Sequence, residues 1–390
     1  MTALWIFFLM AMLLYLAISL ALQIGIRRLP ENEADFLPAI SILIAARNEE
    51  DNLPRCLEAL LKNDYPTSLL EILVIDDRST DNTRHVAQSF AQHHTHIRVI
   101  TLEHRLQGMS GKASAICHGM DTARGEIILI TDADCVPSPQ WIGSMVSGFT
   151  ENIGMVGGFT MLSEMNGKYD GLISQVQNLD WIYLLSVGAG AAGFGKPVSI
   201  LGNNFGFRRC VYEAVGGYRR LGFTIIEDCA LMKAMIRQTR WRVRFLLKPA
   251  AAITSRPPLA WRAFTEQRKR WAAGGKEVSG FGKILLISAF LRHVATLLAL
   301  VLLTPIWPAL AIIASVLLAD FLLLMLATGR LRRRDTLVYF PFFQLYFLLY
   351  SLFLAPVVVL PTTVRWKDVD YHWRFGQRTN KVDDPQVNAL

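Results

Sequence analysis

Asp132 and Asp134 stand one residue apart at the end of the apolar run 127–130. In an extended strand, residues i and i+2 point to the same side, so this D-x-D pattern aims two carboxylates at one point. Two such negative charges repel each other unless a positive group lies between them. A hard divalent cation suits these oxygen ligands, and Mg²⁺ is commonly held by carboxylates together with substrate phosphates. The pair therefore predicts a site for Mg²⁺ or Mn²⁺.

Two more acidic pairs have both a chemical and a structural interpretation. Asp76 and Asp77 close the apolar run that begins at residue 71, where an aspartate is as often a turn or cap residue as a ligand contact. Glu227 and Asp228 precede the helix-like stretch CALMKAMIRQ, and a helix dipole favours negative charge in the first turn. Both interpretations stay open for these residues on local pattern alone.

The segment QRKRW brings three different functional groups to one helix face. Positions 267, 270 and 271 hold Gln267, Arg270 and Trp271, which helical spacing places side by side. Arginine can pair with a diphosphate through two parallel hydrogen bonds, and tryptophan offers a flat surface to a sugar ring. The longer segment WRAFTEQRKRW also suits an amphipathic helix at a membrane surface, and the two interpretations are compatible.

The elements that must position these groups alternate regularly. Strand-like runs at 39–46, 71–77, 96–102 and 126–134 are separated by stretches with apolar residues at helical spacing. This order predicts a parallel sheet with helices on both faces. Ligands of such sheets bind beyond the carboxyl ends of the strands, which is where the acidic pairs fall.

The chain is too apolar for a soluble domain alone. Its 390 residues are 52% hydrophobic, and residues 3–26 carry no charge over a length sufficient to cross a bilayer. Arg27 and Arg28 follow, which predicts a retained anchor with its C-terminal end in the cytoplasm. A cleavable signal peptide is excluded by the absence of a basic start and of a small-residue cleavage site.

A second apolar region runs from 284 to 360. Pro305 and Pro308 predict a hairpin of two spans within 294–326, and residues 337–360 form a further segment. Basic residues flank that segment on both sides, so a full crossing and a re-entrant hairpin both remain open. A full crossing would leave Lys367 of the tail on the side opposite the soluble domain. The predicted division is 1–28 anchor, 38–260 soluble domain, 261–283 interfacial amphipathic helices, 284–360 membrane region and 361–390 polar tail.

Charge and cysteine usage exclude two classes of protein. The net charge of +8 is explained by basic residues at the membrane edges, which would face anionic lipid headgroups, so no nucleic-acid partner is expected. The five cysteines lack the spacing of a zinc site and are expected to be reduced thiols of a cytosolic domain.

Six segments in one order, VIDDRSTDNT, GKASAI, TDAD, GNNFGFRR, IIED and QRKRW, carry a family resemblance over about 38–271. The chain resembles the membrane-integrated glycosyltransferases of family 2, the group that contains cellulose, chitin and hyaluronan synthases and ceramide glucosyltransferases. The resemblance implies a GT-A nucleotide-diphosphosugar transferase domain of α/β class with a mixed, mainly parallel sheet, plus N- and C-terminal transmembrane helices. It also implies inverting transfer from a nucleotide-diphosphate sugar, with a UDP-sugar favoured.

The same resemblance assigns roles to individual residues. Asp228 matches the catalytic base, although Ile226 stands where many relatives have threonine. Asp132 and Asp134 match the metal ligands, and Asp76 matches a contact to the donor base or ribose. The implied donor-binding residues are Ala46, Glu49, Asp76, Asp77, Lys112, Asp132 and Arg270. The implied acceptor-binding residues are Asn203, Asn204, Glu227, Gln267 and Trp271. The glycine-rich segment 188–197 is expected to be a loop, with a mobile gate as the alternative.

The acceptor has two candidate classes. The few C-terminal spans and the membrane-adjacent site favour a lipid or lipid-linked acceptor at the cytoplasmic face, as in a bacterial inner membrane. The Q-x-x-R-W motif favours the alternative, a processive polysaccharide synthase. A non-catalytic membrane assembly protein that binds a nucleotide sugar would lack the base or metal residues, whereas Asp132, Asp134 and Asp228 are all present.

Overall fold

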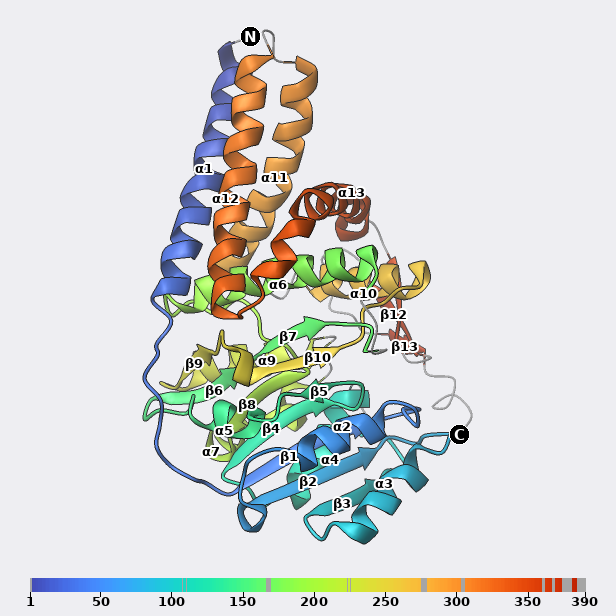
Figure 1. Ribbon diagram of the computed structural model, residues 1–390. Coiled ribbons are helices and arrows are strands. Elements are labelled where there is room, and N and C mark those ends of the chain that lie inside the picture. Colours follow the sequence, from blue (N-terminus) through green and yellow to red (C-terminus); the bar gives the residue numbers. More distant parts are fainter. Residues whose placement is uncertain are drawn as a thin grey trace.

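The computed structural model describes residues 2–106, 108–109, 111–165, 170–222, 224, 226–274, 279–302, 306–359, 362–366, 369–373 and 381–383. Long helices form a bundle at one end, and an α/β domain fills the other (Figure 1). A layer of helices lies between them. This division separates the apolar termini of the sequence from its alternating middle.

The α/β domain is built on a seven-stranded sheet with the order β3-β2-β1-β4-β8-β6-β9. All neighbouring strands pair in parallel except β8, which runs antiparallel to both β4 and β6. The sheet is therefore mixed and mainly parallel, which confirms the predicted class. The strands are β1 Ile40–Ala46, β2 Leu70–Asp76, β3 Ile97–Thr101, β4 Ile127–Asp132, β6 Ile153–Gly157, β8 Asn204–Arg208 and β9 Arg242–Phe245. A second sheet pairs β5 Val136–Pro137, β10 Ala252–Ser255 and β7 Phe159–Leu162.

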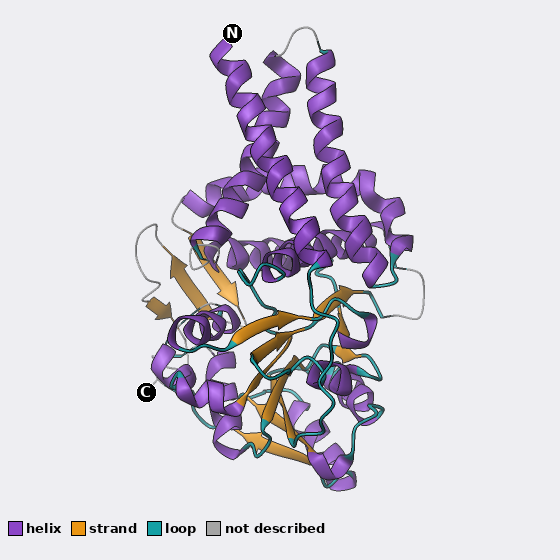
Figure 2. Ribbon diagram, turned by 90° about the vertical axis from the view of Figure 1, so that its left-hand side faces the viewer, coloured by secondary structure: helices purple, strands orange, loops and turns teal. Residues whose placement is uncertain are grey.

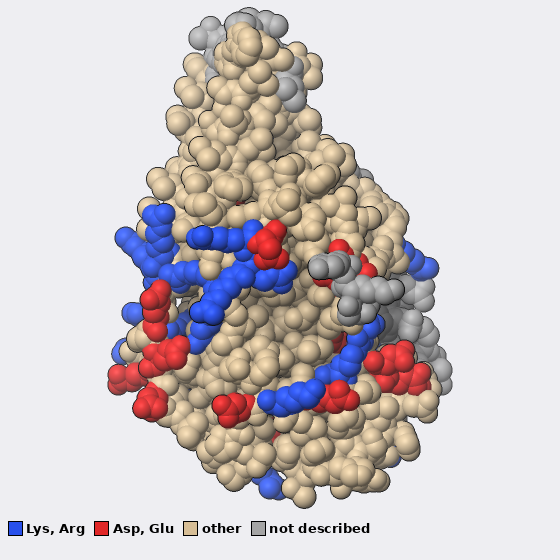
Figure 3. Space-filling model, in the orientation of Figure 1, with Lys and Arg blue, Asp and Glu red and all other residues tan. Residues whose placement is uncertain are grey.

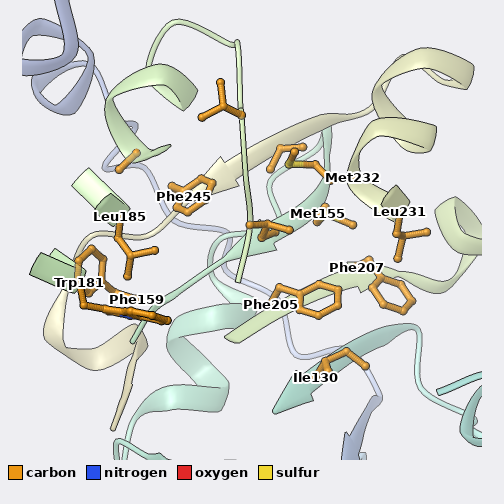
Figure 4. Packing of buried hydrophobic residues seen from close by; sticks show 14 of the residues in the cluster. Ile130, Met155, Phe159, Trp181, Leu185, Phe205, Phe207, Leu231, Met232 and Phe245 are labelled. Atoms are coloured by element: carbon orange, nitrogen blue, oxygen red, sulfur yellow. The ribbon is translucent and has the colours of Figure 1, made fainter. Parts of the chain in front are cut away.

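Alternation along the strands divides the core into two halves. In β1, Leu43 packs in one cluster with α4, whereas Ile42 and Ile44 pack in another with α2 and α5. Figure 4 shows part of the first cluster, in which Trp181 and Leu185 of α6 lie beside Phe159 of β7, and side chains of β4, β8 and α9 continue the cluster on the other side of the view. The helices are α2 Leu53–Leu61, α3 Thr83–His93, α4 Gly111–Thr122, α5 Trp141–Val146, α6 Leu172–Ala192, α7 Arg209–Ala214, α8 Gly217–Leu221 and α9 Glu227–Gln238.

Three long helices stand side by side in the bundle: α1 Thr2–Arg27, α11 Gly280–Leu302 and α12 Trp307–Arg330 (Figures 1 and 2). Together with Arg334–Phe353, they supply four segments long and apolar enough to cross a membrane. Arg27 and Arg330 lie in the last turns of α1 and α12. Basic side chains gather below the uncharged bundle surface in Figure 3. Such a basic edge is typical of the cytoplasmic side of a membrane protein.

Helix α13, Phe340–Val359, lies differently from the three long helices. In Figure 1 it is seen almost end-on, whereas α1, α11 and α12 run up the picture. It packs chiefly against α6 and against α10, Trp261–Gly274, in the layer between bundle and domain. The chain then continues on the side of the α/β domain, where β11 Thr362–Trp366, β12 Val369–Trp373 and β13 Lys381–Asp383 form an antiparallel sheet. Lys367 lies outside the described residues.

The expected loop at 188–197 is wrong for its first half, because residues 188–192 continue α6. The glycines there make room for a second helix. A Cβ added at Gly25 would lie 1.9 Å from the Gly190 carbonyl oxygen, and one at Gly193 would lie 1.9 Å from the Gly25 oxygen. The glycines therefore let the backbones of α1 and α6 touch, as small residues do in membrane helix packing.

Candidate functional site

A single cavity of about 560 Å³ extends from the carboxyl ends of β1 and β4 to the helices α1 and α11. It brings together most of the predicted site residues: Ala46, Glu49, Asp77, Lys112, Asp132, Asp134, Asn203, Glu227, Asp228, Gln267, Arg270 and Trp271. Asp76 and Asn204 do not line it. The cavity thus has a polar end at the sheet edge and an apolar end in the bundle.

Lys112, in the first turn of α4, already supplies a positive charge to the D-x-D motif. Its Nζ donates to Asp132 Oδ1 at 2.5 Å and to the Gly202 carbonyl oxygen at 2.8 Å. Burial alone would lower the pKa of Lys112, but the charges of Asp132 and Glu227 outweigh burial and raise it. The amine therefore stays protonated. The repulsion between the two aspartates is thus relieved in part by Lys112, and a metal is not its only remedy.

The metal prediction depends on a set of oxygen donors that is incomplete by itself. Asp132 and Asp134 both reach the cavity, and both are hard ligands that suit Mg²⁺ or Mn²⁺. Among the residues that the structure describes, no three His, Cys, Asp or Glu side chains are grouped closely enough to hold a metal. The two aspartates therefore fit such an ion only with phosphate and water oxygens as further ligands.

At the end of β2, Asp77 lines the cavity, while Asp76 turns inward. Asp76 is 1% exposed and its Oδ1 accepts a hydrogen bond from the Ser79 amide at 3.2 Å. Asp77 Oδ1 accepts from Arg78 Nε at 3.0 Å, and its Oδ2 lies 3.8 Å from Arg105 Nε. Arg78 has a φ of 59°, a conformation that is strained for arginine and occurs often at functional sites. Asp76 thus shapes the turn that carries Asp77.

Asp228 lies in the cavity wall at the start of α9. Its Oδ1 accepts from the Cys229 amide at 2.6 Å, and a methyl group at Gly202 would lie only 2.9 Å from Oδ2. Loss of water around the carboxylate, and next the negative charge of Glu227, raise the pKa of Asp228 to about 7. A carboxylate with this pKa is suited to accept a proton near neutral pH.

The position of Ile226 changes the local support of the base. Ile226 precedes α9, and its backbone amide donates to Thr224 Oγ1 at 3.2 Å. The family resemblance implies a threonine at 226, and Ile226 has no hydroxyl at that place. The hydroxyl of Thr224, two residues earlier, accepts the hydrogen bond of the Ile226 amide. The charge balance of Asp228 comes instead from Lys112 and Arg270, which lower its pKa against the effect of burial.

Helix α10 carries the Q-x-x-R-W residues into the cavity wall. Gln267, Arg270 and Trp271 all line it, and the Trp271 ring lies 4.7 Å from the ring of Trp181 on α6. The intervening Arg268 has another role that the sequence analysis did not identify. Its guanidinium lies 4.4 Å from the Trp271 ring and pairs with buried Asp180 at 2.5 Å. A lone acid in the apolar stretch NLDWIYLL was the available signal, but its partner lies 88 residues later.

The two predicted asparagines separate in the structure. Asn203 lines the cavity and accepts from Thr160 Oγ1 at 3.0 Å. Asn204 is buried between the two sheets, where its amide nitrogen donates to Phe159 and Ala251 carbonyl oxygens at 2.8 and 3.0 Å. Its oxygen accepts from Trp141 Nε1 at 2.9 Å. These contacts assign Asn204 to the framework of the domain.

A polar cluster lies within the bundle, beside the apolar end of the cavity. Arg292 of α11 pairs with Asp320 of α12, and Asp320 also accepts hydrogen bonds from Tyr15 of α1 and Tyr183 of α6. Gln344 of α13 donates to the same carboxylate at 2.8 Å. One buried acid thus joins five helices. In the sequence, Arg292 and Asp320 are isolated charged residues within apolar stretches, and nothing local pairs one with the other.

Comparison with known proteins places this geometry in a family. Residues 41–216 match Glycosyl transferase family 2. The probable glycosyltransferase YdaM of Bacillus subtilis is 30% identical over 246 residues, covering 62% of this chain and 56% of that protein. A beta-monoglucosyldiacylglycerol synthase of a Nostoc species is 28% identical over 242 residues, covering 61% and 49%. A poly-beta-1,6-N-acetyl-D-glucosamine synthase of Staphylococcus epidermidis is 24% identical over 253 residues, covering 64% and 58%.

The chain spans about half the length of these relatives. Among solved structures, a mannosyltransferase of Pyrobaculum calidifontis in complex with GDP-Man and Mn²⁺ aligns with a TM-score of 0.52 at 18% identity. The alignment covers 90% of this chain and 98% of that one, and shows that the fold is shared. Residues 41–216 therefore resemble Glycosyl transferase family 2, and they lie in an α/β domain of GT-A fold that is joined to a bundle of membrane-type helices.

Proposed function

We propose that the protein transfers a sugar from a nucleotide-diphosphate sugar, with a UDP-sugar favoured, to a lipid or lipid-linked acceptor at the cytoplasmic face of a membrane. One observation carries the proposal. The cavity that contains the carboxylates Asp132, Asp134 and Asp228 is also lined by apolar residues of the helices α1, α6 and α11. A donor that is soluble in water and an acceptor that is soluble in the membrane can meet there.

The donor occupies the polar end of the cavity. Glu49 and Asp77 face the nucleotide, and Arg270 pairs with the diphosphate through its planar guanidinium. Asp132 and Asp134 would hold Mg²⁺ or Mn²⁺, which would stabilise negative charge on the leaving nucleoside diphosphate. Lys112 keeps Asp132 in place by a hydrogen bond before the donor arrives. The strand end and the helix start therefore set the geometry in advance.

Asp228 is the base of the reaction. Its carboxylate takes the proton of the acceptor hydroxyl while that oxygen displaces the diphosphate from the anomeric carbon, with inversion. Glu227 next to it raises the pKa of Asp228 toward neutrality, which makes the carboxylate a better proton acceptor. Trp271 and Gln267 border the space where the acceptor hydroxyl approaches.

Three crossings explain the topology better than four. Helices α1, α11 and α12 cross the membrane, with the basic ends of α1 and α12 at the cytoplasmic side. Helix α13 remains in the layer that contacts α6 and α10, so the tail that follows stays on the side of the catalytic domain. The conflict in charge flanking at 337–360 is then resolved. A bacterial inner membrane is the location that we infer.

The test is nucleotide release by the purified full chain in lipid nanodiscs with Mn²⁺ and a panel of UDP-sugars and GDP-mannose. We expect release from one donor that increases when a lipid extract is added, together with a product that carries a single sugar. A long ladder of products would instead support a processive polysaccharide synthase, which the Q-x-x-R-W residues also favour. Donor binding without release under any of these conditions would contradict transfer.

A further inference from the structure

We infer that the acceptor is an uncharged lipid alcohol, such as a glycerolipid with a free hydroxyl, which enters the cavity sideways from the bilayer. The inference rests on the proposed function and narrows its acceptor. It concerns the part of the cavity bounded by α1, α6 and α11, which we call the acceptor arm. Residues of the arm include Ile18, Leu22, Trp181, Leu185, Leu286 and Ser288.

The acceptor arm carries no charge. Among the described residues, those that α1, α6 and α11 contribute to the cavity wall are apolar, small, hydroxyl-bearing or aromatic, and none is Lys, Arg, His, Asp or Glu. The basic residues that line the cavity, such as Lys112 and Arg270, belong to its polar end. A phosphate held in an apolar arm would lack a cation, and burial of an unpaired charge is very costly. An uncharged headgroup meets no such cost.

The charged pair nearest to the arm does not alter this conclusion. Arg292 and Asp320 pair with each other within the bundle, and neither lines the cavity. Asp320 accepts further hydrogen bonds from Tyr183 at 3.2 Å and from Gln344 at 2.8 Å. The pair is thus directed at neighbouring helices, and Tyr183, which lines the cavity, is one of the hydrogen-bond partners of Asp320.

Two buried polar atoms of the arm have no hydrogen-bond partner within the described structure. They are Oγ of Ser288, which is 3% exposed, and Nε1 of Trp181, which is 7% exposed. Buried polar atoms of native proteins are nearly always paired, so an unpaired one on a residue that lines a cavity is available to a ligand group or a water molecule. A hydroxyl and an indole N–H suit an ester carbonyl or an alcohol. Neither can neutralise a phosphate.

The wall of the arm at α11 includes an exposed residue. Leu286 lines the arm and is nevertheless 53% exposed, on the face of the helix that a bilayer would cover. The next residue, Ile287, is 58% exposed and does not line the arm. An acyl chain can therefore remain in the bilayer while its headgroup enters beside Leu286. Trp181 and Trp271, whose rings lie 4.7 Å apart, line the same cavity as Asp228 and border the path of the headgroup.

The bond changes in the transfer are balanced without a further reactant. The acceptor oxygen forms a bond to the anomeric carbon, and the bond from that carbon to the diphosphate oxygen breaks. The bonding electrons leave with the nucleoside diphosphate, and the hydroxyl proton moves to Asp228. The product is an uncharged glycolipid, which can return to the bilayer through the same opening.

The first experiment compares acceptors with identical acyl chains. The full chain in nanodiscs receives its active donor and Mn²⁺ with dioleoylglycerol, dioleoyl phosphatidic acid, a polyprenyl phosphate, or no addition. We expect sugar transfer to dioleoylglycerol at least tenfold faster than to either phosphate lipid. Preference for a phosphate lipid would overturn the inference while leaving the proposed function intact. If no lipid supported transfer, the proposed function itself would fail.

The second experiment closes the arm. Ala289→Trp, which places a large ring in the wall of the arm, should lower transfer to dioleoylglycerol at least tenfold and leave donor binding by titration calorimetry unchanged. Ile287→Trp is the matched control. Ile287 is exposed and lies two residues earlier on the same helix, on roughly the opposite side, so this variant should transfer like wild type. Unchanged transfer by Ala289→Trp would contradict the inference.

A gentler variant guards against misfolding of the tryptophan variant. Ser288→Ala removes the unpaired hydroxyl with almost no change in volume. We expect a severalfold higher KM for dioleoylglycerol, with the KM for the donor and the melting temperature unchanged. An unchanged KM for the lipid would show that Ser288 does not contact the acceptor.

Discussion

Asp228 at the sheet edge and Asp320 in the helical bundle are acids with opposite surroundings. Asp320 is fully buried and is matched by Arg292, two tyrosines and Gln344. Asp228 faces the cavity next to a second acid, Glu227, and its pKa is raised because the surrounding protein removes water. The first environment stabilises an arrangement of helices. The second leaves a carboxylate ready to take up a proton.

Asp180 lies between these two cases. It is fully buried and paired with Arg268, like Asp320 with Arg292, and it accepts a hydrogen bond from Tyr350 at 2.8 Å. However, Arg268 also lies against Trp271, which lines the cavity. A buried ion pair can therefore hold helices together and position a residue of the site at once. Variants of these acids and of their partners therefore distinguish an acid that stabilises the helix packing from an acid that takes part in the reaction.

Asp228→Asn should abolish transfer and leave the fold intact. The amide cannot accept the proton of the acceptor hydroxyl, and loss of a general base typically slows a reaction by about 10²–10⁴-fold. Nucleotide release with acceptor lipid measures the rate, and titration calorimetry with the donor shows whether binding is kept. A rate within tenfold of wild type would remove Asp228 from the role of base.

Asp320→Asn should lower stability and leave the chemistry unchanged. Breaking a buried ion pair leaves Arg292 without its counter-charge, and such a change typically costs about 3–5 kcal/mol. We expect a clear fall in melting temperature in detergent, while the transfer rate per folded molecule stays near that of wild type. The control is Arg292→Met with Asp320→Leu, which removes both charges and should recover much of the loss. A single variant that melts like wild type would contradict the structural role of the pair.

Arg268→Met should affect stability and activity together. It leaves Asp180 unpaired and removes the guanidinium from the face of Trp271, a contact worth about 0.5–2 kcal/mol. We expect a lower melting temperature and a rate of transfer that is reduced roughly tenfold, chiefly through a higher KM for the acceptor. Arg268→Lys keeps the charge but loses the planar stacking, so it should recover stability more than activity. Loss of stability alone would reduce Arg268 to a purely structural residue.

Glu227→Gln should move the pH dependence of the reaction. We expect kcat/KM of the wild type to rise with pH through about 7, because in the proposed reaction the deprotonated form of Asp228 accepts the proton. The negative charge of Glu227 raises that pKa, so its removal should shift the rising limb to lower pH. Glu213→Gln, at an exposed position on α7, is the control and should not shift the limb. A shift to higher pH would contradict the charge coupling.

The order of strands and the residues at their ends were predictable from sequence because both are local. Apolar runs of strand length mark β1 to β4, and parallel pairing brings the ends of these strands to one edge whatever the rest of the chain does. Asp132 and Asp134 lie at the cavity as a consequence, whereas Asp228 reaches the same cavity from the first turn of α9. The choice between Asp76 and Asp77 was not predictable, because it depends on how the turn at Ser79 bends back.

The helical layers were predicted less well from sequence, because the contacts that hold them join residues far apart in the chain. The glycines near residue 190 look like a loop until α1 is placed against them, and Asp180 gains meaning only from Arg268. Lys112 was predicted near the donor, but its bond to Asp132 of β4 follows from the packing of α4 against β1 and β2. The strands β11 to β13 were not predicted because the tail was interpreted as polar, although VDYHW of β12 alternates apolar and polar residues.

The glycine contact between α1 and α6 has a mechanical consequence. Each residue of a helix rises about 1.5 Å. The contact of Gly25 with Gly190 and Gly193 therefore fixes the position of the α/β domain along the axis of α1. Helix α6 also carries Trp181 and Asp180, so the same glycine contact fixes the rotation of α6, which forms part of the cavity wall. A side chain at Gly25 would displace and rotate that wall. Helix α1 therefore also positions the wall of the site.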